Sequence, residues 1–160
     1  MSNGISAQKI EEVKRYLERN YVSKRQIFEG GFPQISKSNQ PIRHILSSLE
    51  DGFAVSLLKQ IDEKGLTDVE CYKRAGVSKQ TWYKIMNEDG YQPSKNTVLC
   101  FAFALQLSLS ETQRLLQTAG YALSKSKKKD VIIEYFLSRG EYDLFVVNEA
   151  LFAFGQTLLR

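Results

Sequence analysis

A chain of 160 residues, of which 42% are hydrophobic, can bury a core, and this composition excludes a disordered polypeptide. It holds no apolar run of the roughly 18 residues that span a bilayer, and its first residues lack the apolar block of a signal peptide. Cys71 and Cys100 are too few for a disulfide framework and form no zinc pattern with His44, so we expect reduced thiols in a cytoplasmic protein without metal or cofactor.

The net charge of +4 is unevenly distributed along the chain. Residues 1–50 carry eight basic and five acidic residues, residues 51–123 carry eight of each, and residues 124–160 carry six and five. The central segment is therefore neutral. This counts against tight binding to nucleic acid, because the neutralisation of phosphates supplies most of the non-specific affinity.

Residues 1–50 are expected to form a helical extension. An apolar stripe at helical spacing predicts a helix from about residue 7 to residue 20. The stripe consists of Ile10, Val13 and Leu17. Glycine and proline at residues 30–33 then break regular structure, and a proline that suits the first helical position predicts a short helix over residues 41–49.

Residues 51–123 are expected to form a domain of five short helices. The first would be capped within residues 48–51 and stopped by Gly65. Its apolar face would consist of Leu57, Leu58 and Ile61. A capping box over Thr67–Glu70 predicts the start of the second helix, which would end at about Ala75.

A serine precedes each of the next three predicted helices and can cap it. These serines are Ser78, Ser94 and Ser108, the last within a second capping box that ends at Glu111. Gly76 permits a left-handed residue before the third helix, whose inner face would carry Trp82 and Ile85. The fourth helix is strongly apolar to about Leu107, and Gly120 ends the fifth.

The pattern of residues 124–160 predicts two further helices, from about residue 127 to 138 and from about residue 142 to 154. The last holds more large apolar side chains than one buried face needs. They are Leu144, Phe145, Val147, Leu151, Phe152 and Phe154. Such a helix is either buried within the body, including under residues 1–50, or shared with a second copy in a homodimer. The lysines at 127–129 are a solvated helix start or, alternatively, an arm that lies on phosphates.

Two short helices joined by Gly76, Val77 and Ser78 have the layout of a helix-turn-helix. If Trp82 and Ile85 hold the second helix on the body, its other side points outward. That side carries Lys79, Gln80, Tyr83 and Lys84. These long, donor-rich side chains suit the reading of a major groove. The alternative is an ordinary solvated helix face.

The segments over residues 57–67 and 75–85 resemble the Cro/C1-type (XRE) helix-turn-helix family. Residues 93–97 and 104–111, with an alanine-leucine-x-leucine-serine segment, resemble that family's fourth and fifth helices. The resemblance implies an all-α fold with a five-helix repressor-like unit, and a sequence-specific, DNA-binding transcriptional regulator as the function. The implied DNA-binding residues are Thr67, Lys73, Arg74, Ser78, Lys79, Gln80, Tyr83 and Lys84.

Some residues depart from the family pattern and keep a second function open. Asp68 stands where many members carry a glutamine that holds a phosphate, and Glu88 and Asp89 follow the predicted recognition helix. Residues 53–160 also resemble a helical module at the C-terminal end of some multidomain bacterial proteins, including ones that carry macro domains. The alternative is therefore a non-enzymatic interaction or adaptor protein that retains the repressor fold and binds a protein partner. Without a glycine-rich phosphate loop or a cluster of metal ligands, we expect no enzyme.

Overall fold

The computed structural model describes residues 4–22 and 51–159, and every regular element within them is a helix. The predicted all-α fold class is confirmed for this part of the chain. The helices are α1 (Ala7–Asn20), α4 (Phe53–Glu63), α5 (Asp68–Ala75), α6 (Lys79–Asn87), α7 (Lys95–Ala104), α8 (Leu109–Thr118), α9 (Lys128–Ser138) and α10 (Leu144–Ala153). None of them is long and apolar enough to cross a membrane. The predicted breaks at residues 30–33, the helix over 41–49 and His44 lie outside the described residues.

Side-chain caps start most of these helices, largely where the sequence predicts them. The capping residues are Ser6, Thr67, Ser78, Ser94, Ser108 and Asp143. The capping box of Thr67 and Glu70 is complete in both directions. At the second predicted box only one half is present: Ser108 accepts from the Glu111 amide, while the Glu111 carboxylate lies 3.6 Å from the Lys64 ammonium. The predicted cap of α4 is wrong: the helix begins after Gly52 without a side-chain cap, and Asp51 instead bonds Lys59.

The fourth predicted helix ends earlier than expected. α7 stops at Ala104 rather than near Leu107, because Gln106 adopts a left-handed backbone with φ of 53°. This turn lets the Leu107 amide donate to the Ala102 carbonyl at 3.0 Å, which satisfies one of the last carbonyls of the helix. The chain then reverses into α8.

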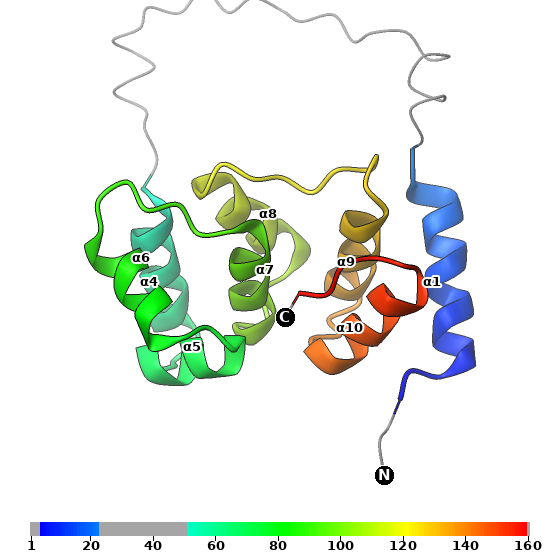
Figure 1. The fold of residues 1–160 in the computed structure, drawn as a ribbon, viewed down its shortest axis with the longest axis horizontal. Coiled ribbons are helices and arrows are strands. Elements are labelled where there is room, and N and C mark those ends of the chain that lie inside the picture. The colour runs from blue at the N-terminus through cyan, green and yellow to red at the C-terminus, as the bar shows by residue number, and fades with distance from the viewer. Residues whose placement is uncertain (1–3, 23–50, 160) are drawn as a thin grey trace, which may run out of the picture.

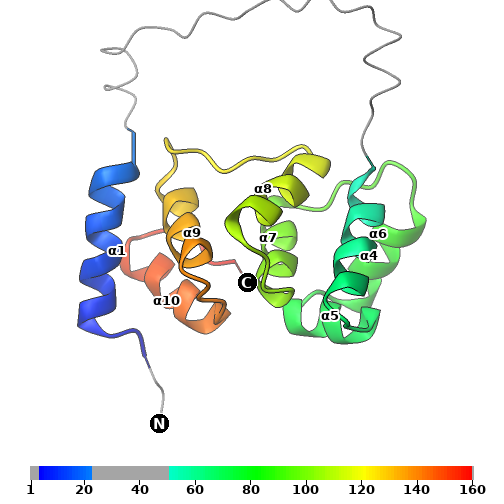
Figure 2. The ribbon, with the colours of Figure 1, turned by 180° about the vertical axis from the view of Figure 1, so that it is seen from behind.

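Two helices that are buried over most of their length form the centre of the molecule (Figures 1 and 2). α7 buries every residue from Val98 to Phe103 and packs against α5 and α8, while α4 packs on α5 and α8. α9 buries most of the residues from Asp130 to Leu137 and packs against α1, α8 and α10. Because each of them is covered by neighbours on several sides, α7 and α9 hold the other helices together in one continuous core.

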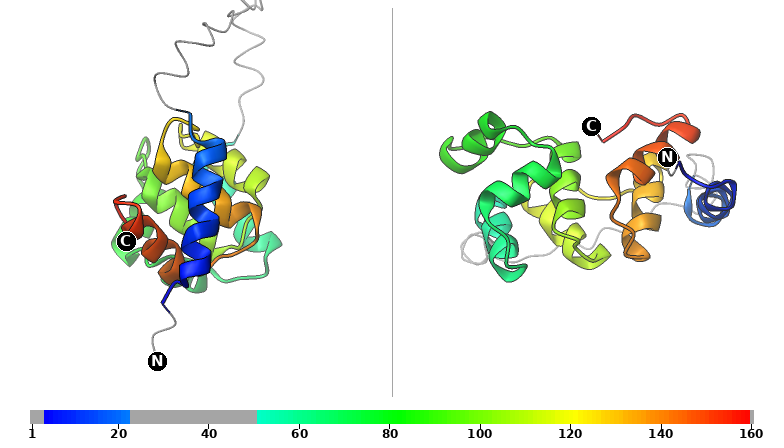
Figure 3. Two further views of the ribbon diagram at one scale, coloured as in Figure 1. Left: turned by 90° about the vertical axis from the view of Figure 1, so that its right-hand side faces the viewer. Right: turned by 90° about the horizontal axis from the view of Figure 1, so that it is seen from below.

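The described part of residues 1–50 covers the C-terminal helices. α1 packs on α9 and α10, at the end of the molecule opposite α6 (Figures 1 and 3). Val13 and Leu17 supply the buried side of α1. The extension therefore packs on the body over residues 7–20, although α1 leaves Phe145 and Phe152 on α10 exposed.

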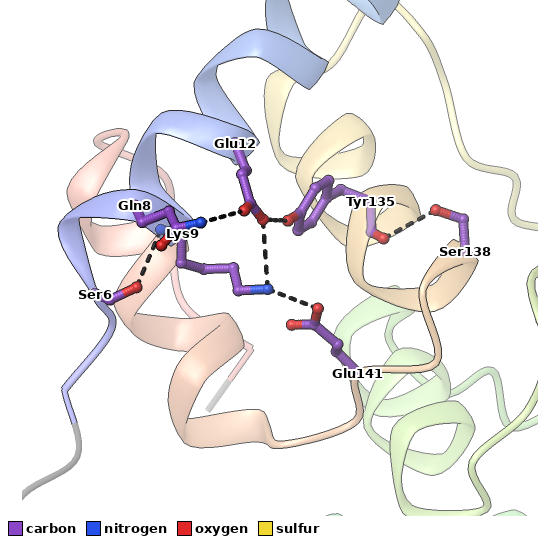
Figure 4. A network of polar contacts seen from close by, with 7 residues as sticks. All are labelled: Ser6, Gln8, Lys9, Glu12, Tyr135, Ser138 and Glu141. Atoms are coloured by element: carbon purple, nitrogen blue, oxygen red, sulfur yellow. Dashed lines mark hydrogen bonds and ion pairs between the residues drawn. The ribbon is translucent and has the colours of Figure 1, made fainter.

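Polar contacts fix α1 in this position (Figure 4). The Lys9 ammonium lies 2.7 Å from a Glu141 carboxylate oxygen, and the Tyr135 hydroxyl donates to Glu12 at 2.8 Å. This hydroxyl, and then the positive charge of Lys9, lower the pKa of the Glu12 carboxyl, whereas the Glu141 carboxylate raises the pKa of Lys9. Both residues are therefore held in their charged forms.

The segment after α10 returns across the molecule and ends beside α7. Leu159 is buried, and its amide donates to the Asn148 side chain at 2.8 Å. The Lys129 ammonium lies 3.0 Å from Thr157 Oγ1 and 3.0 Å from Asn96 Oδ1, and burial lowers the pKa of this lysine. The interpretation of lysines 127–129 as a wholly solvated helix start is thus wrong for Lys129, which anchors the returning segment.

Candidate nucleic-acid interface

The connection between α5 and α6 is a tight, fully hydrogen-bonded turn. Gly76 has φ of 69°, a left-handed conformation that a residue with a Cβ adopts at a cost. Its amide donates to the Lys73 carbonyl at 3.0 Å, and the Val77 amide donates to the Tyr72 carbonyl at 2.9 Å. This pair of bonds ends α5, and Ser78 immediately caps α6. The orientation of α6 relative to α5 is therefore fixed by the backbone.

Aromatic packing fixes which side of α6 faces the body. The Trp82 ring lies 5.5 Å from the Tyr72 ring on α5 and 6.0 Å from the Phe101 ring on α7, measured between ring centroids. Ile85, one turn further along, is also buried. The two residues that the sequence places on the inner face therefore attach α6 to both neighbouring helices, and the opposite face points away from the core.

The outward face of α6 gathers the four side chains that the sequence predicts to read DNA. They are Lys79, Gln80, Tyr83 and Lys84, all of them exposed, with Tyr83 at 62%. Together with Glu88 they line an open depression of about 480 Å³, which we call the α6 hollow. α6 lies at one end of the molecule, clear of α9, α10 and α1 (Figures 1 and 3). A long, rod-shaped ligand can therefore reach it.

The basic side chains of α5 and α6 are not used inside the protein. None of the four makes an ion pair with any residue of the described chain. They are Lys73, Arg74, Lys79 and Lys84. By contrast, Lys95 lies 2.7 Å from buried Asp130, and Lys125 lies 2.8 Å from Glu134. The cations of α5 and α6 are thus available to an external anion.

The two predicted contact residues that cap helices differ in what they can still offer a ligand. Thr67 Oγ1 accepts from the Glu70 amide at 3.2 Å, so its hydroxyl hydrogen stays free to donate. The Ser78 hydroxyl donates to Thr81 Oγ1 at 3.0 Å and accepts from the Thr81 amide, so its hydrogen is already engaged within the protein. Asp68 is exposed next to Thr67 and would repel a phosphate bound there.

Arg74 is not among the residues of the α6 hollow. It lines a different depression, of about 740 Å³, with Gln106, Tyr142 and Phe145 among its other lining residues. This grouping brings together α5, the turn between α7 and α8, and the start of α10. Sequence reasoning missed it because it depends on how residues 51–123 pack against residues 124–160, which no local pattern reveals.

The two cysteines lie in the core rather than on the outward face of α6. Cys71 is fully buried, and its burial raises the pKa of the thiol to about 12, so it stays protonated. Cys100 is also buried, and its sulfur lies 3.6 Å from the Leu159 carbonyl oxygen. Within residues 4–22 and 51–159, no three His, Cys, Asp or Glu side chains gather to hold a metal ion.

Comparison with protein-family models, with curated proteins and with solved structures gives no match for this chain. What the site can do therefore follows from its own residues and geometry.

Proposed function

We propose that this protein is a sequence-specific, DNA-binding transcriptional regulator that places α6 in the major groove. One observation carries the proposal: the side of α6 away from Trp82 and Ile85 presents an amide, a tyrosine and two lysines around one hollow, and neither lysine makes an ion pair with a described residue. The B-DNA major groove is wide enough to admit an α-helix, and base edges within it are read by side chains of these kinds. The resemblance of residues 57–85 to the XRE family agrees with this assignment.

The side chains divide into base readers and phosphate contacts. Gln80 can pair with adenine through both atoms of its amide, and Lys79 can donate to guanine. Lys84 and Tyr83, one turn further along α6, suit a phosphate or a thymine methyl group. Lys73, near the end of α5, and the free hydroxyl hydrogen of Thr67 would contact the sugar-phosphate backbone.

The test begins with selection of duplexes from a randomised library by the full-length protein. The affinity for the selected duplex is then measured by fluorescence anisotropy at several salt concentrations. Lys79→Ala or Gln80→Ala should weaken the free energy of binding to the selected duplex by about 1–3 kcal/mol and relax sequence specificity. Lys73→Ala should instead weaken binding to all duplexes and reduce the slope of log affinity against log salt concentration by about 0.9. Lys14→Ala is the matched control, since Lys14 lies on α1 at the other end of the molecule and is exposed, with no ion partner among the described residues.

The proposal fails if the wild-type protein binds no duplex at about 50 mM salt, where even non-specific binding is strong. It also fails if the Lys14 variant loses as much affinity as the Lys79 variant. In that case net charge, rather than the α6 surface, would account for binding.

A second candidate function is that of a non-enzymatic adaptor with the repressor fold. The observation that favours it is Glu88, whose carboxylate shares the α6 hollow with Lys79 and Lys84. Asp68 adds a further exposed acid beside Thr67. For an adaptor, the selected duplex pool would show no consensus, and changes in the α6 hollow would leave DNA affinity unchanged.

A further inference from the structure

The α6 hollow is more apolar than its residue types suggest. Four of its five lining residues are charged or carry an amide, yet most of the surface that lines it is apolar. The apolar atoms in these residues are the Tyr83 ring and the methylene groups of the longer side chains. A lysine keeps its ammonium group in water while its methylene stem lies along apolar neighbours. The hollow is therefore an apolar site with polar groups at its rim.

Tyr83 is the aromatic residue of this site, and its ring is open to a ligand. The residue is 62% exposed, and its side chain makes no hydrogen bond or ring contact with a described residue. Lys79 and Gln80 lie one turn before it, where side chains three or four residues apart are neighbours on a helix. Because Trp82, the preceding residue, packs on two other helices, the Tyr83 ring is held toward solvent.

The charge and polarity of the hollow indicate which part of a duplex can enter it. A phosphate is disfavoured inside the hollow, because the Glu88 carboxylate lines it and like charges repel. Base edges carry no net charge, and the C5 methyl group of thymine is the apolar group that they present in the major groove. Side chains recognise this methyl group through apolar contact. A thymine methyl group therefore matches both the apolar surface and the charge of the hollow.

We propose that the α6 hollow binds the C5 methyl group of a thymine, so that Tyr83 recognises a T·A base pair next to the pair that Gln80 reads. This inference rests on the proposed function, since it requires α6 to lie in the major groove. Gln80 and Tyr83 are three residues apart, which is about 4.5 Å along a helix. Successive base pairs are about 3.4 Å apart, so the two side chains can contact neighbouring pairs.

The other contact open to Tyr83 is a hydrogen bond from its hydroxyl group to a phosphate. The two contacts use different atoms of one side chain, because the ring meets the methyl group and the hydroxyl group meets the phosphate. Phenylalanine keeps the ring and removes the hydroxyl group, whereas serine removes the ring. Two substitutions at this position, combined with removal of the methyl group from the DNA, therefore separate the two contacts.

The test uses the full-length protein and the duplex selected from the randomised library. Each thymine is replaced in turn by deoxyuridine, which lacks the methyl group and keeps every hydrogen-bonding atom, and fluorescence anisotropy gives the dissociation constant. At the thymine that meets Tyr83, the wild-type protein should bind the deoxyuridine duplex about four-fold more weakly, the effect of one methyl group that is no longer buried. Because only the DNA is changed, this step does not depend on the folding of a variant.

Substitutions of Tyr83 then assign the effect to its ring. Tyr83→Phe should keep the four-fold preference for thymine, whereas Tyr83→Ser should reduce the ratio of the two dissociation constants to about one. The matched control is Phe152→Ser, which removes an exposed aromatic side chain from α10, away from α6 (Figure 1), and should keep the four-fold preference. Since Tyr83 is exposed, its serine variant is expected to keep the wild-type melting temperature; if it does not, Tyr83→Asn replaces it.

The results that overturn this inference differ from those that overturn DNA binding itself. If the wild-type protein binds no duplex, both proposals fail. If it binds the selected duplex and tolerates deoxyuridine at every thymine, only the recognition of a methyl group fails. That recognition is also overturned if Tyr83→Ser keeps the preference for thymine, or if Phe152→Ser loses it, because the methyl group would then be read elsewhere. Loss of the preference in Tyr83→Phe would assign the contact to the hydroxyl group instead.

Discussion

Glu88 is the residue that best separates DNA binding from the adaptor function, because it is the acidic member of the α6 hollow. In a DNA complex its carboxylate would face the phosphate that Lys84 attracts. Two unit charges about 6 Å apart in water repel by about 0.7 kcal/mol. Screening over a Debye length of about 10 Å at 0.1 M salt reduces this to about 0.4 kcal/mol. Glu88→Gln should therefore lower the dissociation constant for DNA about two-fold, and by more at lower salt.

The assay is fluorescence anisotropy with one selected duplex at two salt concentrations, with Asp89→Asn as the control. Asp89 is also exposed and adjacent in sequence, but it does not line the α6 hollow. It should change the affinity less than Glu88→Gln does. Equal gains from the two variants would show that only net charge matters. A loss of affinity in the Glu88 variant would refute the placement of this carboxylate beside the bound phosphates.

Three further predictions concern the fold that supports these surfaces. The pKa of Glu12 is lowered in the folded protein, so this carboxylate contributes stability that is present above its ordinary pKa of 4.5 and lost as the pH falls through the lower, folded value. Glu12→Gln should therefore make the free energy of unfolding, measured with urea from about pH 3 to pH 6, depend less on pH. Gln106→Gly should raise the free energy of unfolding by about 0.5–1 kcal/mol, because glycine adopts its positive φ without strain, and no gain in urea titration would contradict this. Asp130→Asn should lower the free energy of unfolding by about 3 kcal/mol, because it leaves the partly buried Lys95 without its carboxylate partner. Glu134→Gln should lower it by under about 1 kcal/mol, because its partner Lys125 is more exposed. Equal losses would show that burial does not set the difference.

The helices were predictable because their starts are encoded locally. A serine or threonine directly before a segment with helical apolar spacing is visible in the sequence, and its side-chain oxygen can accept from the backbone amide three residues later. Thr67, Ser78, Ser94 and Ser108 all cap helices in this way, as predicted. The inner face of α6 was predictable for the same reason, since helical spacing alone places Trp82 and Ile85 together.

Contacts between distant segments could not be predicted in this way. The sequence leaves open whether residues 1–50 cover α10, and the answer depends on tertiary partners such as Tyr135 for Glu12 and Glu141 for Lys9. Arg74 shows the same limit. It is three residues from Val77 and belongs to the predicted DNA-binding set, yet the packing of α10 places it in a different depression from Lys79.

Unpaired surface cations alone do not identify a binding site, because Lys14 on α1 is also exposed and makes no ion pair within residues 4–22 and 51–159. α6 differs because two independent features coincide on one helix. Its inner side is fixed by Trp82 against two other helices, so its outer side is held in a constant orientation. That outer side combines lysines with Gln80 and Tyr83, and amide and aromatic groups distinguish bases where charge alone cannot. A solvated face needs only charge, whereas a rigid face with directional donors is what selective recognition of a duplex requires.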